Sequence, residues 1–295
     1  MAASPLNLKS HSQTRSNSLP SEPQPLILKC NEHLSRLEAS NAACSSSSLL
    51  SLKVNGLHDL HDCVEKLVQL PHTQQVLVQE HQEKWVNELL DGSLRLLDIC
   101  TAAKDALLHT KECARELQSI IRRKRGGEVE ITAEARKYLT SRKVMRKAIT
   151  KALGNLKGAA NKSKFSPSKK GHQTKASFVL LKDVEVATLF IFESLLNYIS
   201  GPTQSKASNW SLVSKLMQTK RVACTQEADE NEFAKVDAAL QSFVFHATSK
   251  ADNINHLQNQ LENLESCIQD FVEGLETLFR SFIKIRVAIL NIINH

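Results

Sequence analysis

The sequence predicts an all-α protein, an elongated helical bundle organised by a long C-terminal helix. Between residues 254 and 292, twelve apolar residues recur in alternating steps of three and four, the heptad pattern of a helix packed along its length. The chain has only nine Gly and seven Pro, and no Pro follows Pro202, so helices can run without interruption in the last third. A hydrophobic content of 41% is enough for a substantial core.

The N-terminal part of the chain predicts a tail followed by two helices. Residues 1–24 are rich in Ser, Pro and Asn, a composition typical of a disordered tail. The N-terminal half of the bundle is expected over residues 25–156. It begins with a helix over 24–40, and a helix over 56–70 follows the serine run at 45–48 and ends before Pro71.

Two longer helical segments complete the N-terminal half. Helical periodicity continues from 73 to about 125, and the Asp-Gly-Ser sequence at 91–93 predicts a kink or a break in it. After Gly126 and Gly127, a basic helix is expected over 132–156. A basic, flexible linker is then expected over 157–176 because this stretch is polar and rich in Lys and Ser.

The C-terminal half is expected over residues 177–295. Three helical segments are predicted in it, over 178–200, 209–221 and about 229–294. The heptad-patterned part, 254–292, is about 58 Å long at 1.5 Å per residue. Its flanks carry the apolar Val272, Phe279 and Ala288, where a two-stranded coiled coil usually has charges. We therefore expect the helix to pack within its own chain and the protein to be monomeric.

The net charge of +7 is distributed unevenly. Residues 122–175 carry 17 Lys and Arg against three acids, a local charge of +14, whereas the rest of the chain carries −7. Such a segment can contact an acidic protein, an anionic membrane surface or nucleic acid, or can simply remain solvated. The candidate residues for an anionic partner are Arg122, Arg123, Lys124, Arg125, Lys162, Lys164, Lys169 and Lys170.

Sequence-specific recognition of nucleic acid is not expected from this segment. Base reading usually relies on stacking aromatic side chains. Between residues 122 and 178 the aromatic residues are Tyr138, Phe165 and Phe178 alone. An anionic membrane surface or nucleic acid is kept as an alternative partner of this segment, and neither is favoured.

The tail contains a candidate phosphorylation motif. Arg15, Ser16, Ser18 and Pro20 match the pattern R-S-x-S-x-P, which 14-3-3 proteins read when the second Ser is phosphorylated. Arg15, three residues before Ser18, suits a basophilic kinase, and the added phosphate would pair with an arginine cluster in the reader. Protein partners are therefore expected, with a 14-3-3 protein among the candidates once Ser18 is phosphorylated. A solvated tail without this role is the alternative.

Seven cysteines occur at positions 30, 44, 63, 100, 113, 224 and 267, and no two form a C-x-x-C pair. Most of them fit helical patterns, so we interpret them as buried thiols of a reducing compartment. His58, His61 and Asp62 share one helical turn, but no fourth ligand at a suitable spacing supports a metal site. No metal and no cofactor are expected.

Common catalytic signatures do not occur in the chain. The patterns G-x-G-x-x-G, G-x-x-x-x-G-K-[ST], H-E-x-x-H and G-x-S-x-G are all missing. His109 and Cys113 lie one helical turn apart, but nothing nearby suggests an oxyanion donor, so a structural pair is expected. We assign no catalytic residue and do not expect an enzyme.

Several separated blocks, in the same order along the chain, resemble the plant BYPASS-related family. The blocks are RSNSLPS at 15–21, LLDGSLRLLD at 89–98, AKD at 103–105, IFESLL at 191–196, WSLVSKLM at 210–217, CIQD at 267–270 and LE at 275–276. The resemblance implies an all-helical protein linked to root and shoot development and to a root-derived mobile signal. It implies no established molecular activity and no catalytic residue.

These observations together predict a non-enzymatic helical scaffold or regulatory protein in the cytoplasm. The nucleus is the alternative location, because RRKR at 122–125 resembles an import cluster. The alternative function is a peripheral membrane or nucleic-acid binder that acts through residues 122–175. The apolar stretch at 178–199 contains four ionisable residues, so it is not expected to span a membrane.

Overall fold

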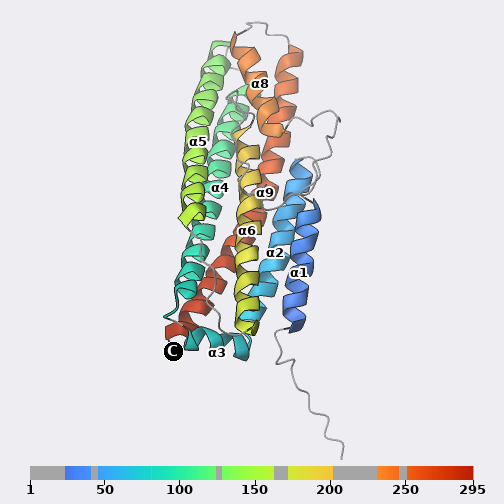
Figure 1. Ribbon diagram of the computed structural model, residues 1–295. Helices are drawn as coiled ribbons and strands as arrows, with labels where there is room; N and C mark the ends of the chain where they lie inside the picture. The colour runs from blue at the N-terminus through green and yellow to red at the C-terminus, as the bar shows by residue number, and fades with distance from the viewer. Residues whose placement is uncertain are drawn as a thin grey trace, which may run out of the picture.

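The computed structural model describes residues 24–40, 46–80, 82–123, 128–162, 172–201, 231–245 and 251–294. Within these ranges the regular secondary structure is entirely helical, in eight helices, which confirms the predicted all-α class. The long helices lie side by side in one elongated bundle, and a short helix lies across one end (Figure 1). The predicted tail, apart from residue 24, and the predicted helix at 209–221 lie outside the described ranges.

The first two helices pack closely together. Helix α1 (Gln24–Ala39) agrees with the prediction, but α2 (Ser47–Val68) begins nine residues before the predicted start at 56. Ser46 caps α2, because its hydroxyl accepts a hydrogen bond from the Leu49 N–H at 3.3 Å. Gly56 therefore lies inside the helix, where a Cβ atom would come within 2.8 Å of the Leu37 side chain. Its role is to let α1 approach α2.

The boundary between helices α3 (Pro71–Gln79) and α4 (Lys84–Arg122) differs from the predicted position of a break. Helix α4 continues through Gly92, so the predicted break at 91–93 is wrong. Instead, α3 ends at Gln79 and α4 begins at Lys84, with no Gly or Pro between them in the sequence. The Trp85 Nε1–H donates to Glu80 Oε2 at 2.8 Å. Helix α3 lies across the end of the bundle, against α9 (Figure 1).

Helices α5 (Glu128–Lys162) and α6 (His172–Ser200) are longer than predicted. The segment between them is correspondingly shorter than the predicted linker at 157–176, and its residues 163–171 lie outside the described ranges. Helix α6 ends at Ser200, as predicted. Gly201 follows with a φ of 72°, a left-handed conformation that Gly adopts without a steric penalty.

The predicted segment at 229–294 is two helices, α8 (Glu232–Phe245) and α9 (Ala251–Asn294), which pack against each other. Asn231 caps α8 by accepting from the Ala234 N–H at 2.6 Å. It also donates to the Tyr198 carbonyl at 3.0 Å, which joins the start of α8 to α6.

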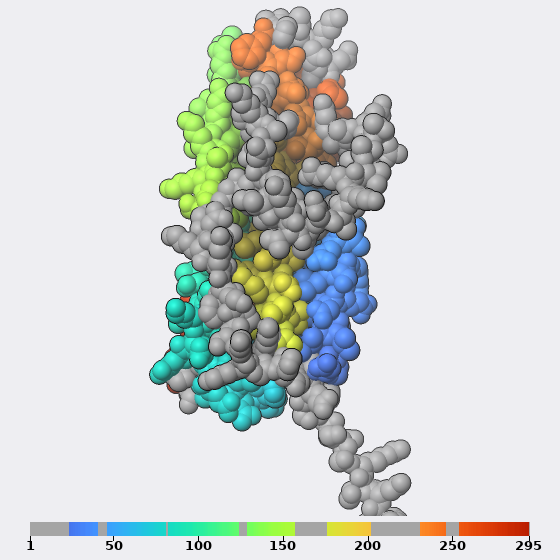
Figure 2. Space-filling view, in the orientation of Figure 1, coloured from blue at the N-terminus to red at the C-terminus, as the bar shows by residue number. Residues whose placement is uncertain are grey.

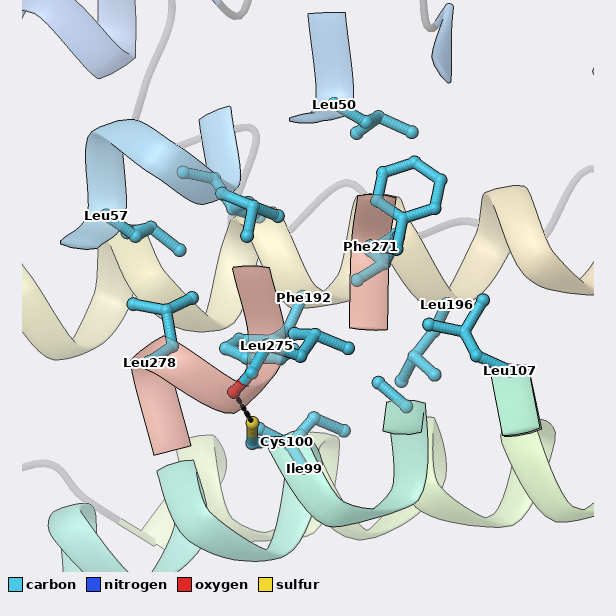
Figure 3. Close-up of a cluster of buried hydrophobic side chains, with 14 of the residues drawn as sticks. Leu50, Leu57, Ile99, Cys100, Leu107, Phe192, Leu196, Phe271, Leu275 and Leu278 are labelled. Atoms are coloured by element: carbon cyan, nitrogen blue, oxygen red, sulfur yellow. Dashed lines mark hydrogen bonds between the residues drawn. The ribbon is translucent and has the colours of Figure 1, made fainter. Parts of the chain in front are cut away.

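The heptad pattern predicts α9 correctly, because the helix is continuous for 44 residues and most of its apolar stripe is buried. Leu264, Phe271 and Leu278 are each at most 1% exposed. Figure 3 shows Phe271, Leu275 and Leu278 of α9 facing side chains from α2, α4 and α6. The flanking Val272 is also buried, so the stripe is wide and is covered within the chain.

One hydrophobic core therefore includes helices from both ends of the sequence. In its central part, side chains of α2 and α4 meet those of α6 and α9 (Figure 3), and the other described helices add buried residues around them. Gly274 of α9 faces α2, and a Cβ atom there would lie 2.7 Å from Val54 Cγ1. Among the described helices, none has the length and hydropathy needed to cross a bilayer.

Candidate functional sites

The block at 89–98 places Gly92 and Arg95 of α4 beside a buried carboxylate of α6. Arg95 donates from Nε at 3.2 Å and from Nη2 at 2.6 Å to Glu185 Oε1, and Lys182 Nζ donates to Oε2 at 2.9 Å. The Glu185 side chain is 10% exposed. A Cβ atom on Gly92 would lie 2.8 Å from the Glu185 carboxyl carbon, so the missing side chain makes room for the carboxylate.

The same block is bonded to α9 through Arg286. Its Nη1 donates to the Leu90 carbonyl at 2.5 Å and to Ser93 Oγ at 2.7 Å. The Ser93 hydroxyl donates in turn to the Leu90 carbonyl at 2.7 Å. The two arginines thus connect the start of α4 to α6 on one side and to α9 on the other.

His61 of α2 lies at the centre of this region and is 3% exposed. Thr188 Oγ1 donates to the Val184 carbonyl at 2.7 Å, so it accepts from His61 Nε2–H at 2.9 Å. The other ring nitrogen, Nδ1, therefore carries a lone pair, and no described residue forms a hydrogen bond with it. Burial lowers the pKa of His61 to about 3, so the ring is neutral.

A cavity of about 40 Å³ adjoins His61, Gly92, Ser93 and Glu185 and is otherwise apolar. This volume is far below the roughly 300–1,000 Å³ of small-ligand sites, so the cavity is too small for a substrate. Both oxygens of Glu185 are already occupied by cations. We interpret this cluster as a structural connection between helices.

The suggested grouping of His58, His61 and Asp62 is not a metal site. His58 lies beside Asp59, with 39% of its side chain exposed, and Asp62 accepts from Lys66 at 3.2 Å, whereas His61 faces the core. Over the described ranges, no three His, Cys, Asp or Glu side chains are arranged to hold a metal ion.

The predicted anionic-partner residues lie only partly in the described structure. Arg122 is in the last turn of α4, Arg123 follows it, and Lys162 ends α5. Lys124, Arg125, Lys164, Lys169 and Lys170 lie outside the described residues, as do Arg15, Ser16, Ser18 and Pro20 of the phosphorylation motif.

A surface hollow of about 490 Å³, which we call the α4 hollow, adjoins Arg122 and Arg123. Its lining residues are Arg115, Gln118, Ser119, Arg122, Arg123 and Glu265. Arg115 donates from Nε to Glu265 Oε1 at 2.6 Å, and Arg122 donates from Nη2 to Glu262 Oε1 at 3.2 Å. Gln118 is buried, and within the described ranges its Nε2 has no hydrogen-bond partner.

A second basic surface, the α5 basic face, is formed by Arg136, Lys143, Lys147 and Lys151. Their spacing of seven, four and four residues places them on one side of the helix, and all four are exposed. None of the four makes an ion pair with another described residue. Figure 2 shows α5 along the edge of the molecule, with much of its surface uncovered.

His109 and Cys113 do form a local cluster, together with Ser141 of α5. The Cys113 thiol donates to Ser141 Oγ at 3.4 Å, and His109 Nε2 lies 2.5 Å from the same oxygen. The cluster joins α4 to α5. Of the other cysteines, Cys30, Cys63, Cys100 and Cys267 are buried free thiols, and the Sγ atoms of Cys30 and Cys63 are 2.8 Å apart.

Sequence reasoning missed a buried ion-pair network between α5 and α8. Arg142 is 2% exposed and donates from Nε to Asp237 Oδ1 at 3.2 Å and from Nη2 to the Ile199 carbonyl at 2.7 Å. Arg146 donates from Nη2 to Asp237 Oδ2 at 2.5 Å. The Arg142 guanidinium also lies 5.1 Å from the centre of the Phe233 ring.

The sequence does contain a signal that Arg142 is buried. Ala135, Tyr138 and Ile149 define the buried side of α5, and position 142 falls on the same side in helical spacing. Its partner Asp237 could not be identified in this way, because the two residues are 95 positions apart.

A family comparison covers most of the chain. The family model described as Protein BPS1 matches residues 53–292. No curated protein and no solved structure matches the chain. The matched range extends from α2 to α9 and so includes the whole shared core, apart from α1 and the start of α2. The chain therefore belongs to the BPS1 family, the BYPASS-related family that its sequence blocks resemble.

Proposed function

We propose that this protein is a non-enzymatic regulatory scaffold, which binds an acidic protein partner on the α5 basic face. Family membership suggests a plant developmental role, and we propose root and shoot development and signalling as its setting. The observation that carries the proposal is the row of four exposed cations that make no ion pair with a described residue. Several exposed cations on other helices, such as Arg36, Lys66 and Arg280, do have carboxylate partners.

The α5 basic face is held on a rigid support. On the opposite side of the helix, Tyr138 and Ile149 are buried in the core, and Arg142 is bonded to α6 and α8. The backbone is therefore fixed, and only the side chains lose freedom when a partner binds. A fixed positive charge also raises the rate of association with an acidic surface, and this gain in rate falls as the salt concentration increases.

The test is affinity purification from plant tissue with a charge-neutralised variant. Replacing Arg136, Lys143, Lys147 and Lys151 with Gln should remove the captured acidic partner and leave the melting temperature nearly unchanged. The control replaces Lys29, Lys84, Arg280 and Lys284 with Gln, which changes the net charge equally on other surfaces. Equal recovery of partners by both variants would refute the proposal.

A second candidate function is a peripheral membrane or nucleic-acid binder acting through residues 122–175. It is supported by the same exposed cations and by Arg123, which makes no ion pair with a described residue. The purified variant and control distinguish the two functions. Salt-sensitive sedimentation with phosphatidylserine vesicles, lost only in the α5 variant, would favour the membrane function over the protein scaffold.

The N-terminal motif suggests a further regulatory partner. We expect a peptide of residues 8–25 phosphorylated on Ser18 to bind a 14-3-3 protein, because the phosphate adds about −1.5 to −2 charge and three acceptor oxygens. The unmodified peptide and a Ser18→Ala peptide should not bind in calorimetry. Equal binding of the modified and unmodified peptides would contradict this role. The cytoplasm is the location we propose, with the nucleus as the alternative.

A further inference from the structure

The α4 hollow has the donors of an anion-binding site, separate from the α5 basic face. Positions 115, 118, 119 and 122 follow the three- and four-residue spacing of one helix face, so their side chains line the same wall. Helix α9 supplies Glu265 on the opposite side. The lining thus contains three guanidinium groups, one amide and one hydroxyl, against a single carboxylate.

Gln118 is a second observation that points to a ligand in the α4 hollow. Its side chain is 3% exposed, and its Nε2, an obligate donor, has no acceptor among the described residues. Buried polar groups are normally hydrogen-bonded, and each exception needs a physical reason. An acceptor bound in the hollow would satisfy this donor, and the neighbouring arginines favour an acceptor that carries negative charge.

The glutamates do not block the site. Arg115 uses Nε and Nη2 for Glu265, and Arg122 uses Nη2 for Glu262, so each guanidinium keeps unused N–H donors. The two arginine side chains are 59% and 57% exposed, and their pairs are therefore screened by solvent. Arg123 has no carboxylate partner in the described part of the chain.

The end of α4 does not itself attract an anion, because helix C-termini carry partial negative charge. The Arg123 N–H is also occupied, because it donates to the carbonyls of Ser119 and Ile121. The attraction of an anion to the hollow therefore has to come from side chains. Arginine suits this task, because its planar donors match phosphate oxygens in pairs.

We infer that the α4 hollow binds a compact ligand with several phosphate groups, such as an inositol polyphosphate, either free or as a lipid headgroup. The hollow of about 490 Å³ lies within the roughly 300–1,000 Å³ of small-ligand sites. Three guanidinium groups offer more donors than a ligand with a single carboxylate could use. A ligand with several phosphates on one small ring can engage all three. Gln118 would donate to a phosphate oxygen at the buried end of the site.

The test uses the full chain with two probes: inositol hexakisphosphate in calorimetry, and vesicles containing phosphatidylinositol 4,5-bisphosphate in sedimentation. Gln118→Leu should weaken binding of inositol hexakisphosphate at least tenfold while the melting temperature stays the same or rises, because the variant removes an unpaired buried donor. Arg123→Gln should weaken binding similarly. Binding of the soluble probe alone assigns a free ligand, and binding of both probes assigns a shared headgroup chemistry.

Matched controls keep this inference separate from the proposed scaffold function. Arg280→Gln changes the charge on α9 outside the hollow and should bind inositol hexakisphosphate like the parent protein. The fourfold α5 variant should also keep this binding even where it loses its protein partner. The inference is overturned if the parent protein binds neither probe, or if Gln118→Leu and Arg123→Gln both bind as tightly as the parent.

Discussion

At the scale of single residues, this bundle depends on polar groups that are buried in defined pairs. Gly92 shows how a missing side chain supports such a pair, since it leaves room for Glu185 and its two cationic partners. The Asp-Gly-Ser sequence at 91–93 suggested a kink or a break, because Gly is a poor helix former. The structure assigns Gly92 a packing role instead, which depends on a carboxylate 93 positions away and could not be inferred locally.

Gly92→Ala should destabilise the protein by about 1–3 kcal/mol, because the added Cβ displaces the paired carboxylate and this cost exceeds the gain in helix propensity. Gly154→Ala is the control, since nothing lies within 4 Å of a Cβ atom at that position of α5. It should stabilise by about 0.5–1 kcal/mol. Urea unfolding measures both, and a stabilised Gly92→Ala would contradict the role given to Glu185.

His61 should make stability depend on pH. Its pKa falls from an ordinary value near 6.5 to about 3 in the folded protein, so the unfolded chain binds more protons between these limits. The contribution of neutral His61 to folding stability is complete above pH 6.5 and is lost as the pH falls towards 3. Between pH 7.5 and 5, His61 should account for about 2 kcal/mol of lost stability. In His61→Gln this part of the loss should disappear; an unchanged loss would assign the pH dependence to other groups.

At the scale of elements, the heptad repeat predicts α9 well. One side of this helix is buried along its length, so apolar residues recur at the heptad period. Shorter features were harder to predict. The early start of α2 depends on the Ser46 cap, which belongs to the serine run that suggested an interruption, and no Gly or Pro precedes α4 to mark its start. The charge pattern indicated the basic end of α4, whereas the buried Gln118 in the α4 hollow follows only from tertiary structure.

Phe271→Ala should cost about 3–5 kcal/mol, because the ring is 1% exposed and its removal leaves a cavity between α9 and its neighbours. Ile283→Ala on the same helix is the comparison, since Ile283 is 41% exposed and should cost less than about 1 kcal/mol. Chemical denaturation distinguishes them. Similar losses of stability at the two positions would mean that the apolar stripe of α9 does not form the core.

At the scale of the whole molecule, the apolar surface of α9 is used within one chain by α2, α4 and α8. We therefore expect a monomer in solution, because little of the stripe remains for a second copy. Light scattering at low micromolar concentration should give the mass of one chain. A stable dimer under these conditions would count against the expectation that this surface packs only within one chain.

The order of the helices has a consequence for biosynthesis. Helices α2 and α4 are synthesised well before α9, which covers them, because residues 123–250 lie between the end of α4 and the start of α9. At roughly 5–20 residues per second, a ribosome needs about 6 to 26 s to add these residues. During this time the apolar faces that α9 will cover have no partner from the same chain. The nascent protein should consequently depend on chaperones until α9 emerges, and a premature stop codon before α9 should yield a product for degradation rather than a smaller stable bundle.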